Sequence, residues 1–125
     1  MRSLVLDDGY DDLLAPVRPS HKHIYPLIPM DDYITWRRAD GRSFDPWLRM
    51  RTDVGAEVLK VAEESMVVEG TTSAWESWTD ITVVGSDRYL VPEALVPVEF
   101  DRDQDHGRYV EPNVWVRHRL RDDQR

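Results

Sequence analysis

The stretch Tyr109-Val110-Glu111-Pro112-Asn113-Val114-Trp115-Val116-Arg117-His118 carries the clearest strand pattern of the chain. With a period of two residues, one face receives Val110, Val114 and Val116, together with Pro112 and His118. The opposite face receives Tyr109, Glu111, Asn113, Trp115 and Arg117. We expect the valine face to lie in a core. A row of a carboxylate, an amide, an indole and a guanidinium is unusual on a face that only meets water, so the second face is a candidate functional surface.

A second strand is expected just upstream, at residues 95–100. The segment between the two strands is polar and ends in Gly107, which predicts an antiparallel hairpin with a longer loop. Pro97 and Pro112 have no amide hydrogen for a sheet ladder, so each should lie at a sheet edge or a bulge.

Two helices are expected earlier in the chain. Residues 28–38 have a helical spacing of apolar residues, and Gly41 can end this helix. Asp45 suits the N-cap of the next helix, Pro46 its first turn and Gly55 its end.

Three strands and a short helix complete the pattern. Residues 12–18, 56–62 and 65–69 are predicted strands. Ser73 and Glu76 form a capping box for a helix that ends near Thr79, with Trp75 and Trp78 on one face. The order of strand, two helices, two strands, short helix and hairpin predicts an α+β fold.

Composition limits the function. A chain of 125 residues fits one domain, with 1–11 and 119–125 expected to be frayed ends. The net charge of −8 argues against nucleic acid, which needs clustered Lys and Arg. We expect no membrane span, because no apolar run approaches ~20 residues. The absence of cysteine fits a cytoplasmic protein.

Four runs of the sequence resemble the C-terminal part of actinobacterial GNAT-type N-acetyltransferases. They are residues 14–22, 25–30, 44–49 and 109–116, and the run Glu111-Pro112-Asn113-Val114-Trp115 is the most specific of them. The resemblance implies a partial GNAT-like mixed sheet with a C-terminal antiparallel hairpin and two to three short helices.

The resemblance also implies acetyl-CoA as the cofactor and a small-molecule amine as the substrate. In the superfamily, acyl-CoA enters where the sheet splays between its fourth and fifth strands. Leu13–Val17 would be that fifth strand, Pro29–Arg38 the following helix, and the last hairpin would complete the acceptor side. The superfamily's phosphate loop has the form Arg/Gln-x-x-Gly-x-Gly/Ala, and no residues of this sequence match it.

N-acyl transfer needs a base, an acid and donors for the thioester oxygen. Glu111 and His118 are candidate bases, and Tyr33 is a candidate acid beside Tyr25 and Tyr109. Because Glu111 and His118 lie seven residues apart, a regular strand places them on opposite faces, and they should not act as a pair. The competing structural role for Glu111 is a cross-strand ion pair with Arg117 or another basic residue.

Candidate substrate-binding residues are aromatic or amide side chains: Tyr25, Trp36, Trp47, Asn113 and Trp115. Core packing is the competing role for the tryptophans. His21 and His23 alternate in a loop without a nearby carboxylate or cysteine, so we expect no metal site.

Three hypotheses follow. The chain is the substrate-side half of an acyl-CoA-dependent N-acyltransferase, a non-catalytic binding or dimerisation module on a shortened GNAT scaffold, or an unrelated small α+β enzyme with an aromatic pocket. A sheet that lacks half of its strands exposes apolar surface and an open edge. We therefore expect a homo-oligomer or a complex with a complementary chain.

Overall fold

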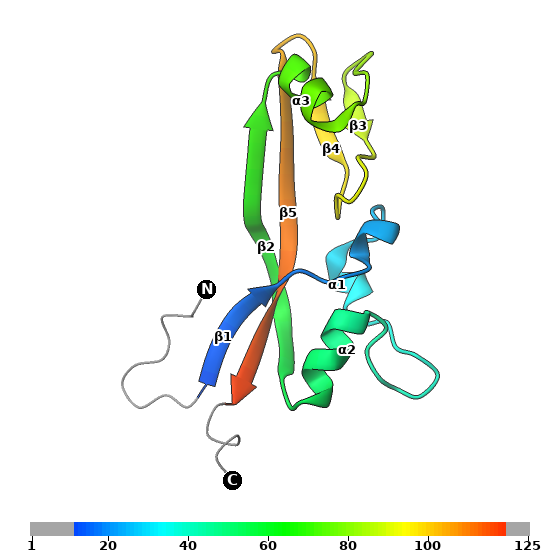
Figure 1. Ribbon diagram of the computed structural model, residues 1–125, viewed down its shortest axis with the longest axis vertical. Coiled ribbons are helices and arrows are strands. Elements are labelled where there is room, and N and C mark those ends of the chain that lie inside the picture. Colours follow the sequence, from blue (N-terminus) through cyan, green and yellow to red (C-terminus); the bar gives the residue numbers. More distant parts are fainter. Residues whose placement is uncertain (1–11, 120–125) are drawn as a thin grey trace.

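The computed structural model describes residues 12–119, and they form an α+β fold (Figure 1). The strands are β1 (Asp12–Val17), β2 (Glu57–Gly70), β3 (Asp87–Tyr89), β4 (Val98–Asp101) and β5 (His106–Arg119). The helices are the single 3-10 turn η1 (Lys22–Ile24), α1 (Met30–Tyr33), α2 (Pro46–Asp53) and α3 (Thr72–Thr79).

Strand β5 is the centre of the sheet. On one side β2 follows it from Gly107 to Arg117, and these two strands form the long axis of the molecule (Figure 1). On the other side β1 pairs with residues 114–119 of β5, whereas β4 pairs with residues 106–108 and carries β3 on its far edge. All of these pairings are antiparallel.

Residues 109–113 of β5 consequently lie in a gap between β1 and β4, where this edge of the strand has no ladder partner among the described strands. Pro112 lies in this gap. On the β2 side the register shifts between Ala62 and Met66, so Pro112 faces a bulge. The prediction that Pro112 lies at a sheet edge or a bulge is confirmed, and the bulge explains how a central strand accommodates a proline.

Two hydrophobic cores lie at opposite ends of the β2–β5 ladder. The first buries Val114 and Val116 of β5 against α1, α2 and the loops around them. The second buries Tyr109 of β5 with Trp75 of α3 and Phe100 of β4. Successive side chains of a strand point to opposite faces, and Tyr109 and Val114 lie an odd number of residues apart. The two cores therefore use opposite faces of β5. The valine face is therefore buried as expected, and the other face is buried at Tyr109.

Helix α2 forms for local reasons. The carboxylate of Asp45 accepts hydrogen bonds from the amides of Trp47 and Leu48, and Pro46 occupies the first turn. The chain leaves the helix through Gly55 at φ +97°. The sequence prediction for this helix is confirmed.

The predicted helix over 28–38 is much shorter in the structure. It contains only Met30–Tyr33, and the chain then turns so that Arg37 bridges to Ser43. Gly41, at φ +84°, serves the turn of this small loop rather than a helix end. The physical cause is tertiary: the Tyr33 side chain is fixed against Asp45 of the next helix.

Two further predictions need correction. Residues 56–62 and 65–69 form the one strand β2, because the long partner β5 pairs with both parts across the bulge. The N-cap of α3 is Thr71, whose hydroxyl accepts from the Ala74 amide, and Glu76 instead accepts from the amide of Val83. The ends predicted to be frayed lie outside the described residues, except for Arg119, which ends β5.

Candidate functional site

The gap along β5 holds a buried polar cluster around Glu111. Its carboxylate accepts a hydrogen bond from the Tyr109 hydroxyl at 2.8 Å and from Asn113 Nδ2 at 3.1 Å. The guanidinium Nε of Arg18, the residue just after β1, lies 3.3 Å from both carboxylate oxygens. We call Arg18, Tyr109, Glu111 and Asn113 the Glu111 cluster.

This cluster joins segments that are distant in the sequence. Besides Glu111, Arg18 binds the carbonyl of Glu93 at 2.6 Å, and the Tyr109 oxygen accepts from the Leu95 amide at 2.9 Å. The loop between β3 and β4 is thereby fixed across the gap. Desolvation by burial is the main reason that the pKa of Tyr109 is raised, so this phenol remains protonated and donates to the carboxylate.

Exposure within the cluster is unequal. The Glu111 side chain is 5% exposed, whereas that of Arg18 is 44% exposed. Solvent can therefore reach the cluster mainly from the Arg18 side. The contact with the exposed Arg18 guanidinium shows that this carboxylate can bind a cation from the solvent side.

The structure brings three residues of the sequence analysis, Tyr109, Glu111 and Asn113, into one site, and it adds Arg18. Sequence reasoning missed Arg18 because it lies 93 residues from Glu111. The expected partner of Glu111 was Arg117 or another basic residue. The structure gives the second alternative, because Arg18 contacts Glu111 whereas Arg117 contacts Glu57 of β2.

Three predicted site residues belong to an aromatic cluster in the first core. Trp36 lies with its ring centroid 5.1 Å from Tyr25, 5.3 Å from Tyr33 and 5.2 Å from Phe44. The Tyr33 hydroxyl donates to the buried Asp45 carboxylate, and burial followed by this hydrogen bond raises the pKa of Tyr33. This geometry gives Tyr33 a structural partner.

The remaining predicted residues lie elsewhere. Trp47 is exposed on α2 and stacks with Arg51, whose guanidinium carbon is 4.8 Å from its ring centroid. The same arginine contacts His118 at 3.0 Å, so His118 and Glu111 have different partners, as their spacing predicted. Trp115 is half-buried at the point where β5 faces Pro16 of β1.

Lys22 is a buried cation that sequence analysis did not single out. Its side chain is 0% exposed, and its ammonium donates to the carbonyls of Tyr25 at 2.8 Å and Leu95 at 2.7 Å. Burial lowers its pKa from 10.5 to about 8. The sequence of this loop gives no signal of such burial, because both acceptors are backbone atoms.

Acetyl-CoA needs an anion site for its pyrophosphate, usually at the N-terminus of a helix. Each of the three α-helices in residues 12–119 has acidic side chains there. Asp45 caps α2, Asp105 accepts from the Thr72 amide of α3, and Asp31 and Asp32 lie in the first turn of α1. The described residues therefore do not fit a pyrophosphate at these positions.

His21 and His23 do not converge on a common ligand position. Their ring centroids are 6.4 Å apart, His21 contacts the hydroxyl of Ser20, and His23 lies 3.8 Å from Glu93. No group of three possible metal-ligating side chains occurs within 12–119. Over the same range, no helix has the length and apolar character needed to cross a membrane.

The sheet order and the helices α1 and α2 between β1 and β2 define an α+β protein that is consistent with a partial GNAT-like fold. Comparison with curated proteins then gives a specific relative. The chain is 34% identical over 136 aligned residues to the Arginine N-acetyltransferase avaD of Aspergillus versicolor. This alignment covers 94% of the chain. The chain spans 47% of that protein's length.

Other comparisons add no relative. No family model matches the chain. No solved structure matches it either. The fungal source of the relative gives no support to the actinobacterial origin that the sequence resemblance implied.

Proposed function

We propose that this chain forms the acceptor side of an acetyl-CoA-dependent N-acyltransferase. The observation that carries the proposal is the 34% identity, over 94% of the chain, to a protein named as an arginine N-acetyltransferase. The GNAT-like order of β1, β5 and β2 supports it. In this proposal the pyrophosphate is held by a part of the acyltransferase that residues 12–119 do not cover.

A basic amine is the acceptor class that the charges favour. The net charge of −8 attracts cations, and Glu111 already holds a guanidinium, that of Arg18. Free arginine presents the same guanidinium group, so an arginine-like acceptor could replace Arg18 at the carboxylate. Glu111 then serves as a binding residue, because three donors of the chain already occupy its oxygens.

Acetyl transfer tests this proposal directly. Acetyl-CoA is first titrated calorimetrically into the purified chain, and the chain is then incubated with acetyl-CoA and either L-arginine or L-norvaline, which lacks the guanidinium. Released thiol and the mass of the acetylated product are followed. Transfer to arginine over norvaline supports the proposal. Because this proposal places the pyrophosphate site outside residues 12–119, a folded chain that neither binds acetyl-CoA nor releases thiol excludes only an independent acyltransferase. Equal transfer to arginine and norvaline contradicts the proposed acceptor site.

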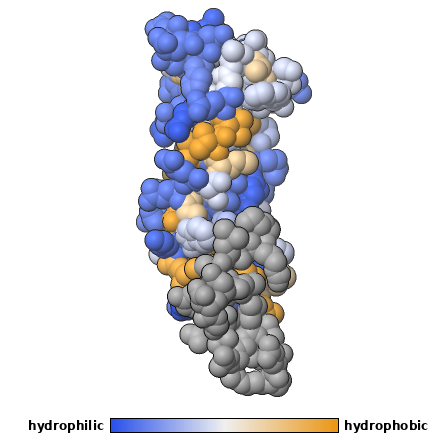
Figure 2. Space-filling view, turned by 90° about the vertical axis from the view of Figure 1, so that its left-hand side faces the viewer, coloured by the Kyte–Doolittle hydropathy of each residue, from blue (hydrophilic) through white to orange (hydrophobic). Residues whose placement is uncertain are grey.

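The open sheet edges favour a second candidate, a dimerisation module. Within the described residues, β1 and β2 each pair only with β5, so each has a second edge without a partner. Figure 2 shows an apolar patch among hydrophilic surface on the side that carries β2. Exposed large hydrophobic residues of β2 are Leu59, Met66 and Val67.

The mass of the protein in solution tests whether the chain is a dimerisation module. Light scattering at micromolar concentration should give twice the mass of the chain if two copies join through these edges. Replacing Val67 by Lys, with Ser65 replaced by Lys as the charge-matched control on the same strand, should return the mass to that of one chain only for Val67. A monodisperse monomer would contradict the hypothesis that two copies of this chain join through these edges.

A further inference from the structure

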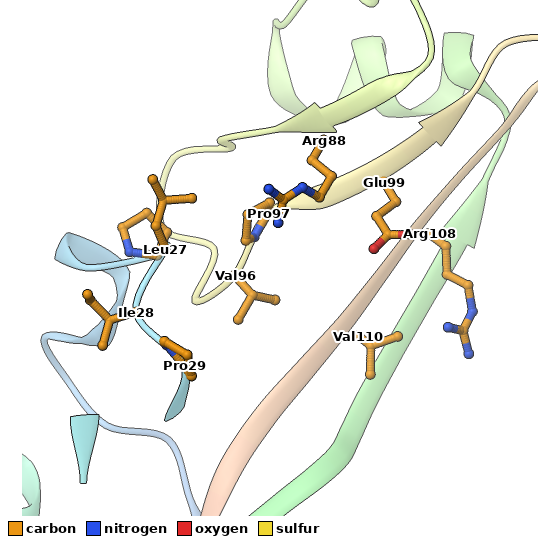
Figure 3. Close-up of a pocket in the computed structure, with 10 residues that line it drawn as sticks. Leu27, Ile28, Pro29, Arg88, Val96, Pro97, Glu99, Arg108 and Val110 are labelled. Atoms are coloured by element: carbon orange, nitrogen blue, oxygen red, sulfur yellow. The ribbon is translucent and has the colours of Figure 1, made fainter. Parts of the chain in front are cut away.

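A cavity lies between the loop at residues 26–29 and the strands β3, β4 and β5, on the face of β5 opposite Glu111. It has a volume of about 310 Å³, which suits a small molecule. Figure 3 shows the loop residues Leu27, Ile28 and Pro29 on one side of it and the strands β3, β4 and β5 on the other.

The walls of this cavity are mostly apolar. They include Ile28, Val96, Pro97 and Val110. Val110 and Glu111 are adjacent on a strand, so their side chains point to opposite faces. A ligand in this cavity therefore lies across β5 from the Glu111 cluster.

Three charged side chains lie along one wall. Arg88 of β3 faces Glu99 of β4, and Glu99 faces Arg108 of β5, so the three form a row across neighbouring strands. Arg108 also lies 3.8 Å from Glu69 on its other side. The Arg88 guanidinium and the Glu99 carboxylate make no hydrogen bond or ion pair with other residues between 12 and 119.

Opposite charges on facing residues have a definite spacing. Directly opposed strand residues have Cβ atoms about 4.5–5.5 Å apart. The ammonium and carboxylate of an α-amino acid are separated by a single carbon, so both can reach such a pair of side chains. An apolar side chain would then contact Ile28, Val96 and Val110.

From this arrangement we propose that the cavity binds a free α-amino acid with a large apolar side chain. Arg88 binds its carboxylate and Glu99 its ammonium group. Arg108 completes the row and leaves the three side chains with one net positive charge. This binding is independent of acetyl transfer, so it would persist in a chain that has no acyltransferase activity.

Calorimetric titration with L-phenylalanine tests the proposal, beside two analogues that each lack one charge. N-acetyl-L-phenylalanine has no ammonium group, and L-phenylalanine amide has no carboxylate. We expect saturable binding of the amino acid and binding of each analogue that is weaker by about 10-fold or more, the loss expected for one charged hydrogen bond.

Variants locate the site. Arg88→Gln and Glu99→Gln should each weaken L-phenylalanine binding by about 10-fold, and both side chains are exposed, so folding should be preserved. Arg38→Gln, which removes an exposed arginine away from the cavity, should leave the affinity unchanged. A melting curve of each variant verifies the fold.

Three results would overturn the proposal. One is the absence of saturable heat up to about 10 mM amino acid. Another is equal affinity for the amino acid and either analogue, which would mean that only one charge is recognised. The third is binding that neither Arg88→Gln nor Glu99→Gln weakens.

Discussion

The hydroxyl of Tyr33 donates a hydrogen bond to the carboxylate of Asp45, and this contact joins α1 to the N-terminus of α2. The same carboxylate accepts from the backbone amides of Ser20 and His21. Asp45 therefore fixes the loop after β1 and both helices of the first core.

Replacing Tyr33 by Phe should lower the free energy of unfolding by about 1–2 kcal/mol, because a buried carboxylate loses one donor. Tyr25→Phe is the matched control, since Tyr25 lies in the same aromatic cluster and its hydroxyl makes no hydrogen bond within 12–119. Urea denaturation measures both. If Tyr33→Phe left stability unchanged and abolished acetyl transfer, Tyr33 would instead be the catalytic acid that the sequence suggested.

Gly107 is packed too tightly for any side chain. A Cβ at this position would lie 2.5 Å from Cε1 of Phe100 and 2.5 Å from Cδ1 of Trp75. The Trp75 indole also donates to the Gly107 carbonyl at 2.9 Å, which prevents an easy retreat of the ring. We expect Gly107→Ala to cost about 3 kcal/mol of stability by overpacking.

The control for Gly107 is Gly85→Ala. Nothing lies within 4 Å of a Cβ at Gly85, so this change should alter stability by less than about 0.5 kcal/mol. Thermal unfolding followed by circular dichroism measures the melting temperature of each variant. Equal melting temperatures for the two variants would contradict the close packing of α3 on β5.

Lys22 should give the protein a characteristic pH dependence. Its pKa falls from 10.5 to about 8 on folding, so the unfolded chain binds more protons between these values. The free energy of unfolding should therefore increase as the pH rises from about 8, by at most about 1.4 kcal/mol per pH unit. Above pH 10 the raised pKa values of Tyr33 and Tyr109 oppose this gain, because tyrosine ionises at 10.0 in the unfolded chain.

Lys22→Met should abolish that increase between pH 8 and 10. It also leaves two buried carbonyls without their donor, at a cost of about 1–3 kcal/mol at neutral pH. Lys60→Met removes an exposed lysine and should change neither quantity. Urea denaturation at several pH values measures the free energy of unfolding of each protein. If this free energy increased equally between pH 8 and 10 in the wild type and in Lys22→Met, Lys22 would not be the group responsible.

Glu111→Gln tests the proposed acceptor site. The change removes the charge that holds Arg18, so we expect at least about a 10-fold loss in kcat/KM for a cationic acceptor, through KM. Glu57→Gln removes the partner of Arg117 on the surface and should have little effect. Unchanged KM for arginine in Glu111→Gln would assign Glu111 a purely structural role.

Local signals predicted the local structure well. Asp45, Pro46 and Gly55 define α2 by capping alone, and the alternation of residues 109–118 predicts both the strand and the faces of its valines. The missing amide hydrogen of Pro112 predicted a sheet edge or a bulge, although not which of the two or which strand would supply the bulge. Such features depend on residues within a few positions of one another.

The Glu111 cluster could not be predicted in the same way. Its members come from the end of β1 and the middle of β5, and their contact follows from the pairing of Val17 with Val114. The early end of α1 is also a long-range effect, since helical spacing over 28–38 is outweighed by the contact between Tyr33 and Asp45. The periodicity of apolar residues along the sequence contains no information about contacts between residues that are distant in the sequence.

The central place of β5 has a consequence for synthesis on the ribosome. Both β1 and β2 depend on β5 for their ladder hydrogen bonds, yet β5 is the last of the described strands to be made. Until it emerges, β1 and the long β2 lack that partner strand, and contacts between β1 and β5 span most of the sequence. The nascent chain should therefore remain aggregation-prone until β5 has emerged from the ribosome, and ribosome-bound chains that end before β5 should be sensitive to protease.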